Sequence, residues 1–256
     1  FNFGLEFFVV FLGCLRAGII AVPVYPPNPA TLKKSLGKLQ LVVNSCEPKL
    51  IIVDSSVNKL RLASKIRAFA KGSGSGWPDL PYHCPDVEEK VPSAATSSMS
   101  GWLGSGSIAV AHRKRKSFDD PSIEPEDVAF LQFTSGSTSD PKGVMVTFAN
   151  LEHNTSCIIR SSELEVKPLG QERVWFSWLP TFHDMGLIQG TIVPFLAGWR
   201  AGYCSPVAFI RNPLIWLKLM SKERSQMTAA PDFAYRLCTR RWKEMTPQAQ
   251  AALKLD

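Results

Sequence analysis

The sequence of 256 residues contains no apolar run long enough to cross a membrane. Its most apolar stretch, residues 4–25, is broken by the charges of Glu6 and Arg16 and ends near Pro23. The uncharged run between those two charges falls far short of the ~20 residues that a membrane-spanning helix needs. We expect a buried helix followed by a buried strand there, and no transmembrane segment.

No C-x-x-C pair occurs among the six cysteines, which lie at positions 14, 46, 84, 157, 204 and 238. Several sit inside apolar runs, where a free cysteine behaves as a small hydrophobic side chain. The cysteine pattern therefore argues against a disulfide framework and predicts a reducing, cytoplasmic location. His83 and Cys84 are the only adjacent pair among the His and Cys residues, and nothing nearby completes a tetrahedral set, so no residue is predicted as a metal ligand.

A strong charge excess is also missing, since the formal net charge is +7 and the pI about 9.2. A moderately basic surface suits nucleic acid, anionic lipid or a phosphorylated substrate. Because acidic residues are spread along the whole chain, we predict no nucleic-acid partner and accept phosphate binding only where a site supports it. With 45% hydrophobic and 20% charged residues, the chain has the profile of a globular protein with one large domain or two lobes.

Apolar patterning predicts an alternation of helices and strands. Predicted helices cover residues 5–17, 31–45, 56–69, 150–160, 184–196, 213–223 and 232–241. Predicted strands cover residues 19–25, 50–53, 128–133, 143–147, 174–178, 200–204 and 227–230. The alternation predicts an α/β fold of layered lobes, with mostly parallel sheets and helices packed on them. Asp184 is placed to cap the helix that it precedes.

Changes in composition and apolar patterning along the chain suggest three segments. Residues 1–71 form a first α/β lobe, residues 72–122 a flexible loop or insertion, and residues 123–256 a second α/β lobe. The middle segment opens with GSGSG, which is a flexible hinge composition, and is rich in Pro, Ser and Gly. Its basic run at residues 112–116 is interpreted as a solvated loop, with a nuclear signal or an anionic docking patch as alternatives.

A loop rich in hydroxyl groups separates two strands of the second lobe. It contains Thr134, Ser135, Gly136, Ser137, Thr138 and Ser139, and Lys142 and Gly143 close it. Glycine lets backbone N–H groups approach phosphate oxygens, Ser and Thr add hydroxyl donors, and lysine adds a point charge. The loop is not a Walker A motif, because Pro141 precedes the lysine and a strand follows it. We predict a strand–loop–strand phosphate site, with a polar surface hairpin as the alternative.

The string T-S-G-S-T-x-x-P-K-G at residues 134–143 resembles the phosphate-binding signature of the adenylate-forming superfamily. That superfamily includes acyl-CoA synthetases, firefly-type luciferases and peptide-synthetase adenylation domains. Residues 13–29 and 177–190 also resemble its motifs, in the same order. The segments YPP, LPTFHDMGLI and TAAPDFAYRLC are most similar to the fatty acyl-AMP ligase branch. The resemblance implies a partial N-terminal domain of an adenylate-forming enzyme.

The resemblance further implies a function. The protein would activate a fatty acid as acyl-AMP with release of pyrophosphate, using ATP and Mg²⁺, and would transfer the acyl group to an acyl-carrier protein. A long-chain acyl-CoA synthetase, with CoA as acceptor, is one alternative. A truncated, non-catalytic paralogue that binds a nucleotide or an acyl group is another.

The resemblance also assigns site residues. Phosphate contacts fall to Thr134, Ser135, Gly136, Ser137, Thr138, Ser139, Lys142 and Gly143. Catalytic roles, by positioning and electrostatics, fall to Lys142 and His183. Substrate contacts fall to His183, Asp184, Met185, Gly186 and Phe233. An acyl channel could be lined by Trp178, Phe182, Met185, Phe233 and Tyr235, although plain core packing is an equal alternative.

Several elements of the superfamily pattern do not occur in these residues. They are the adenine-contacting segment, the later glutamate that helps to hold magnesium, the ribose-binding aspartate, the hinge and the C-terminal lysine. The chain also begins at Phe1 rather than at methionine. We therefore treat it as a fragment, expect little ligase activity from these residues alone, and leave an upstream targeting peptide as an open alternative.

Overall fold

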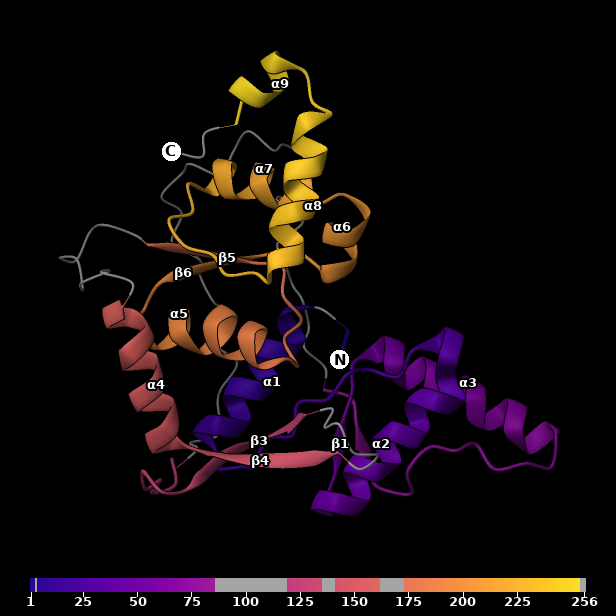
Figure 1. The fold of residues 1–256 in the computed structure, drawn as a ribbon. Helices are drawn as coiled ribbons and strands as arrows, with labels where there is room; N and C mark the ends of the chain where they lie inside the picture. The colour runs from indigo at the N-terminus through magenta and orange to yellow at the C-terminus, as the bar shows by residue number, and fades with distance from the viewer. Residues whose placement is uncertain (3, 86–118, 135–140, 162–172, 254–256) are drawn as a thin grey trace, which may run out of the picture.

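The structure is a computed structural model, and it describes residues 1–2, 4–85, 119–134, 141–161 and 173–253 (Figure 1). The helices are α1 (Leu5–Arg16), α2 (Leu32–Cys46), α3 (Ser55–Ala70), α4 (Phe148–Ser161), α5 (Val193–Leu196), α6 (Pro206–Arg211), α7 (Leu214–Glu223), α8 (Asp232–Lys243) and α9 (Pro247–Ala251), with a 3₁₀ turn η1 (Pro29–Thr31) and a π-helix η3 (Met185–Ile192). The strands are β1 (Ile51–Ile52), β2 (Tyr82–His83), β3 (Val128–Thr134), β4 (Lys142–Thr147), β5 (Val174–Ser177) and β6 (Arg200–Tyr203). The predicted α/β class is confirmed.

The strands of the described residues pair in short sheets. β1 and β2 are parallel, β5 and β6 are parallel, and β3 and β4 form an antiparallel pair. Single parallel bridges extend two of these sheets, from Ala21 to Phe130 and from Trp175 to Met227. Parallel pairing therefore prevails, as predicted, and the antiparallel pair is the hairpin that flanks the predicted phosphate loop.

Two predicted strands are reduced to these single bridges. The strand predicted at 19–25 pairs only through Ala21, because Pro23 has no N–H to donate to a ladder. The strand predicted at 227–230 pairs only through Met227. Beyond it, the hydroxyl of Thr228 donates a 2.7 Å hydrogen bond to the carbonyl of Phe176, so that a side chain takes the place of a backbone donor.

Strand β2 is an element that the sequence patterns did not indicate. It lies inside the segment predicted as a flexible loop, and its Tyr82 packs with buried Trp77 and Leu36 in one hydrophobic cluster. Residues 86–118 of that segment, including the basic run at 112–116, lie outside the described residues. The division of the chain into two lobes and an insertion therefore stays a prediction.

A shared core holds the hairpin and the π-helix together. Phe130 of β3 is fully buried, and it clusters with Phe11 of α1, Leu151 of α4, and Leu187 and Ile192 of η3. Figure 1 shows the helical segment that ends in α5 lying between the β5–β6 sheet and the β3–β4 hairpin. This packing fixes the position of η3 relative to β3, the strand that ends at Thr134.

The helix predicted at 184–196 exists, but its first part is wound as a π-helix rather than an α-helix. In an α-helix the ring of Pro194 would clash with the carbonyl of Gly190. The nitrogen of Pro194 also has no hydrogen to donate to that carbonyl. Here the hydroxyl of Tyr203 donates a 2.8 Å hydrogen bond to that carbonyl instead. The hydroxyl of Thr191 donates to the carbonyl of Gly186, five residues earlier, at 3.2 Å. Both hydroxyls thus donate to backbone carbonyls within the wider winding of η3.

Glycine allows η3 to lie against the segment that follows β5. A Cβ atom added to Gly186 would lie 2.1 Å from the carbonyl oxygen of Pro180, and one added to Gly190 would lie 2.9 Å from the hydroxyl of Ser177. Both distances are too short for any other residue without movement of the neighbours. Across the described residues, every helix is too short or too polar to span a membrane.

Candidate functional site

The β3–β4 hairpin brings the two ends of the predicted phosphate loop together. Thr134 ends β3, Lys142 begins β4, and these two residues are register partners. Directly opposed residues of an antiparallel pair lie ~4.5–5.5 Å apart. Both side chains are exposed, so a hydroxyl and a lysine face solvent at the mouth of the loop. Ser135, Gly136, Ser137, Thr138 and Ser139 lie outside the described residues, and their roles stay predictions.

Gly143 is exposed, but the ring of Phe133 occupies the place that its side chain would take in the same hairpin. Its register partner is Phe133, and a Cβ atom added to the glycine would lie 2.9 Å from the phenyl ring. The ring therefore covers the backbone of β4 just after Lys142. The absence of a side chain at Gly143 is explained by this packing, and a phosphate contact of its backbone stays a prediction.

His183 and Asp184 lie in a turn between β5 and η3. The N–H of His183 donates to the carbonyl of Pro180 at 3.2 Å, and the carbonyl of His183 accepts from the N–H of Leu187 at 2.7 Å. The Asp184 carboxylate accepts from the N–H of Met185 at 2.7 Å, which confirms the predicted cap, and also contacts Nδ1 of His183. The turn is held at its backbone while both side chains remain exposed.

Gln132 joins the hairpin to this turn. Its Nε2 donates a 3.0 Å hydrogen bond to the carbonyl of Phe182, 50 positions away in the sequence. Gln132 lies two residues before Thr134, and Phe182 lies one residue before His183. The strand that leads into the phosphate loop and the turn that carries His183 are therefore neighbours in space.

The proline-rich segment after Val24 reaches the same point. The rings of Tyr25 and Phe182 meet edge to face, with their centroids 4.6 Å apart. Tyr25 belongs to the YPP segment, so this segment and the strand that ends at Thr134 both contact Phe182 of the LPTFHDMGLI segment. This convergence was not predictable from any one of the motifs.

Among the residues predicted to contact substrate, the structure distinguishes three environments. Met185 is half-buried and packs against the aromatic cluster described below. Gly186 is buried against the backbone of Pro180, and its missing side chain permits η3 to lie close to that backbone. Phe233, on α8, is exposed over 47% of its surface. The predicted substrate contacts of these residues stay predictions.

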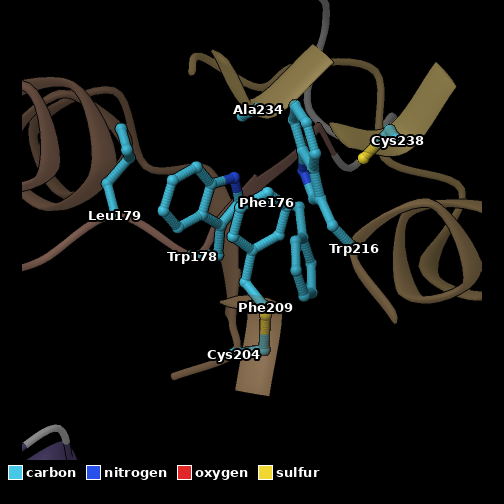
Figure 2. Packing of buried hydrophobic residues seen from close by; sticks show 8 residues of the cluster. All are labelled: Phe176, Trp178, Leu179, Cys204, Phe209, Trp216, Ala234 and Cys238. Carbon is cyan, nitrogen blue, oxygen red and sulfur yellow. The ribbon is translucent and has the colours of Figure 1, made fainter. Parts of the chain in front are cut away.

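Trp178 lies in a cluster of aromatic side chains between β5 and helices α6, α7 and α8 (Figure 2). Its ring stacks on Phe209 with the centroids 3.8 Å apart, and it meets Trp216 and Phe233 edge to face. It is 3% exposed, and its indole N–H has no hydrogen-bond partner among the described residues. Trp178 therefore packs as core. An acyl channel along Phe182, Met185, Phe233 and Tyr235 stays a prediction.

Burial shifts the protonation of several groups next to this core. Burial raises the pKa of Tyr203 to about 12, and a hydrogen bond with Thr191 opposes the shift. Burial also raises the pKa values of Cys204 and Cys238 to about 11. These groups are therefore neutral near pH 7. Among the described residues, no three His, Cys, Asp or Glu side chains gather in a way that could hold a metal ion.

Comparisons with known proteins agree on one family. The family model described as AMP-binding enzyme matches residues 3–255. The chain is 32% identical over 253 residues to the medium-chain-fatty-acid–[acyl-carrier-protein] ligase JamA of Moorena producens, with 99% of the chain and 37% of the relative covered. It is 31% identical over 237 residues to the long-chain-fatty-acid–AMP ligase FadD23 of Mycobacterium tuberculosis, with 91% of the chain and 35% of the relative covered.

Solved structures give the same picture. The chain superposes with a TM-score of 0.73 and 33% identity on a fatty acyl-adenylate ligase from Legionella pneumophila, which was crystallised with acyl adenylate and pyrophosphate. All of the chain and 37% of that ligase are covered. The chain thus spans little more than a third of the length of the proteins that it matches.

Proposed function

Because the chain belongs to the AMP-binding enzyme family, we propose that the full-length protein activates a fatty acid as its acyl adenylate. The activated acyl group would then pass to an acyl-carrier protein. The observation that carries the proposal is the hydrogen bond from Gln132 to the carbonyl of Phe182, since it joins β3, the strand that ends at Thr134, to the turn that carries His183. The names of the relatives, a fatty-acid–[acyl-carrier-protein] ligase and a fatty-acid–AMP ligase, support the substrate and the acceptor.

The proposed reaction forms one bond and breaks another. An oxygen of the fatty carboxylate attacks the α-phosphorus of ATP, and the bond from that phosphorus to the bridging oxygen of pyrophosphate breaks. The carboxylate is already anionic, so no strong general base is needed. Catalysis then depends on holding the reactants in line and on neutralising negative charge.

Lys142 and Thr134 are assigned to the phosphate end of the substrate. Both side chains are exposed at the mouth of the loop, and a lysine is a mobile point charge suited to phosphate oxygens. Mg²⁺ is proposed as a counter-ion of the ATP phosphates. The described residues offer no cluster of ligands for it, so we assign it no protein ligand.

His183 is assigned to the carboxylate end. Its imidazole is exposed and touches the Asp184 carboxylate, and an imidazole N–H can donate a hydrogen bond to an anionic substrate. Its role would be to orient and to neutralise, not to attack. A cytoplasmic location is also proposed, in keeping with six cysteines that are all free thiols.

The acceptor of the acyl group, a carrier protein or CoA, distinguishes the proposed ligase from an acyl-CoA synthetase. A relative from Mycobacterium leprae, 31% identical over 242 residues, is named a putative fatty-acid–CoA ligase, so a CoA acceptor has a specific observation in its favour. Purified full-length protein charged with a labelled fatty acid and ATP should transfer the label to the thiol of a carrier protein. Transfer to CoA alone would favour the acyl-CoA synthetase.

The activation step is tested by fatty-acid-dependent exchange of pyrophosphate into ATP. The full-length protein should catalyse this exchange, and Lys142→Ala should depress it by about 100- to 1000-fold, the range seen when one charge-stabilising group is lost. Lys59→Ala is the matched control, because Lys59 is an exposed lysine on α3. No exchange by the full-length protein would instead support a non-catalytic paralogue. The 256-residue chain alone is expected to show little exchange.

A further inference from the structure

The side-chain amide of Gln132 has two ends, and only one of them is used. Nε2 donates to the carbonyl of Phe182 at 3.0 Å, whereas Oε1 is buried with no hydrogen-bond partner among the described residues. An apolar side chain of similar length would fill the same space without burying an unpaired oxygen. A buried polar group of this kind in a native protein points to a role other than filling the core.

The donated hydrogen bond reaches a peptide that has little freedom of its own. The ring of Phe182 packs edge to face against the ring of Tyr25. The next residue, His183, is tied through its N–H to Pro180 and through its carbonyl to Leu187. Gln132 therefore contacts a turn whose orientation is already narrowly limited.

The strand that carries Gln132 is equally well fixed. Gln132 pairs with Val144 in the antiparallel register, and the pair two residues further on is Thr134 with Lys142. Phe130, two residues before Gln132, is fully buried in the core shared with η3. A displacement of Gln132 along the strand would thus displace Thr134 and Lys142 by a similar amount.

We propose that Gln132 is a positioning residue, whose amide sets the distance between the Thr134–Lys142 strand ends and the His183–Asp184 turn. The inference rests on the proposed function, in which the strand ends hold phosphate and the turn orients the carboxylate. The in-line attack then depends on a spacing that one hydrogen bond maintains. Gln132 itself touches neither reactant.

The test uses two substitutions in the full-length protein. Gln132→Met keeps the length of the side chain and removes the donor, so kcat for pyrophosphate exchange should fall between about 10- and 100-fold, the cost of a misplacement near 1 Å. KM for ATP should change less than kcat, because the phosphate contacts themselves remain. The loss should be less than additive with that of His183→Ala, since both changes act on one turn.

Gln132→Glu provides a signature that a purely structural role would not give. An ionised glutamate cannot donate to the carbonyl of Phe182, whereas a protonated one can. Burial raises the pKa of a carboxyl group, so protonation should occur within the working range of the enzyme. The kcat of Gln132→Glu, relative to the unsubstituted protein, should therefore rise as the pH is lowered, and Gln132→Met should show no such rise.

Gln250→Met is the matched control, because Nε2 of Gln250 donates a 2.8 Å hydrogen bond to the backbone carbonyl of Trp242 far from this site. It should leave kcat unchanged. Hydrogen exchange at the amides of His183 and Leu187 gives a readout independent of activity: exchange should be faster in Gln132→Met and unchanged in Gln250→Met. The full-length protein could lack activity while the amides of His183 and Leu187 exchange faster in Gln132→Met. The proposed function would then fail, but the positioning of the His183–Asp184 turn by Gln132 would stand. Unchanged amides, or an unchanged kcat in Gln132→Met, would overturn the positioning role.

Discussion

The hydroxyl of Tyr203 donates a 2.8 Å hydrogen bond to the carbonyl of Gly190, inside the π-helix η3. Pro194 cannot supply the N–H that an α-helix would direct at that carbonyl. The ring of Tyr203 also packs against Phe8, with the ring centroids 4.6 Å apart. This contact limits the movement of the ring and therefore of the hydroxyl group that it carries. One tyrosine on β6 thus stabilises the helix that begins at the His183–Asp184 turn.

Tyr203→Phe removes that hydroxyl and keeps the ring. The carbonyl of Gly190 is buried with its residue, so the loss should lower the free energy of unfolding by about 1–3 kcal/mol, the cost of an unpaired buried group. Urea unfolding followed by tryptophan fluorescence measures the change. Tyr235→Phe is the control, because Tyr235 is exposed over 48% of its surface. Equal urea midpoints for the two variants would show that the Tyr203 hydroxyl contributes nothing.

The same tyrosine predicts a loss of stability at alkaline pH. Burial raises the pKa of Tyr203 from 10 to about 12, so the folded state holds the proton more tightly than the unfolded state. Its contribution is complete below pH 10 and declines as the pH rises toward 12. Cys204 and Cys238, with pKa values raised from 9 to about 11, add to the decline over a lower range.

Urea midpoints measured on both sides of pH 10 check this prediction. In Tyr203→Phe the decline above pH 10 should be shallower than in the unsubstituted protein, and the part below pH 10 that the thiols contribute should remain. A decline that is identical in both proteins would contradict the assignment to Tyr203.

Sequence alone predicted the parts of the site that are local. The string at 134–143 indicated a phosphate loop between strands, and the structure places Thr134 and Lys142 opposite each other at the strand ends. It could not predict the contact of Gln132 with Phe182, because nothing local links residues 50 positions apart. The π-helix was missed for a related reason. The sequence shows that Pro194 cannot donate a hydrogen bond to the carbonyl of Gly190, but not that the hydroxyl of Tyr203, on β6, donates to it instead. Strand β2 was missed because it is only two residues long and lies between prolines.

The cysteines should differ in their reactivity toward a thiol reagent such as an aromatic disulfide. Cys157 is exposed on α4, whereas Cys204 and Cys238 are buried in the aromatic cluster and have raised pKa values. Thiolate is the reactive form, so the two buried thiols should react only on unfolding. Mass spectrometry of the labelled native protein identifies the modified positions, and Cys157→Ala should remove a fast-reacting thiol. Rapid labelling of Cys204 in the native protein would show that the cluster opens.

Two glycines offer a final comparison, because alanine should have opposite effects at them. At Gly186 a Cβ atom would lie 2.1 Å from the backbone carbonyl of Pro180, so η3 must move away from the turn that carries His183. Gly186→Ala should therefore destabilise the protein by about 1–3 kcal/mol or more. At Gly37, in the middle of α2, a Cβ atom would meet nothing within 4 Å, and alanine should stabilise the helix by about 0.5–1 kcal/mol. Urea midpoints that move in the same direction for both variants would contradict the packing of η3 against Pro180.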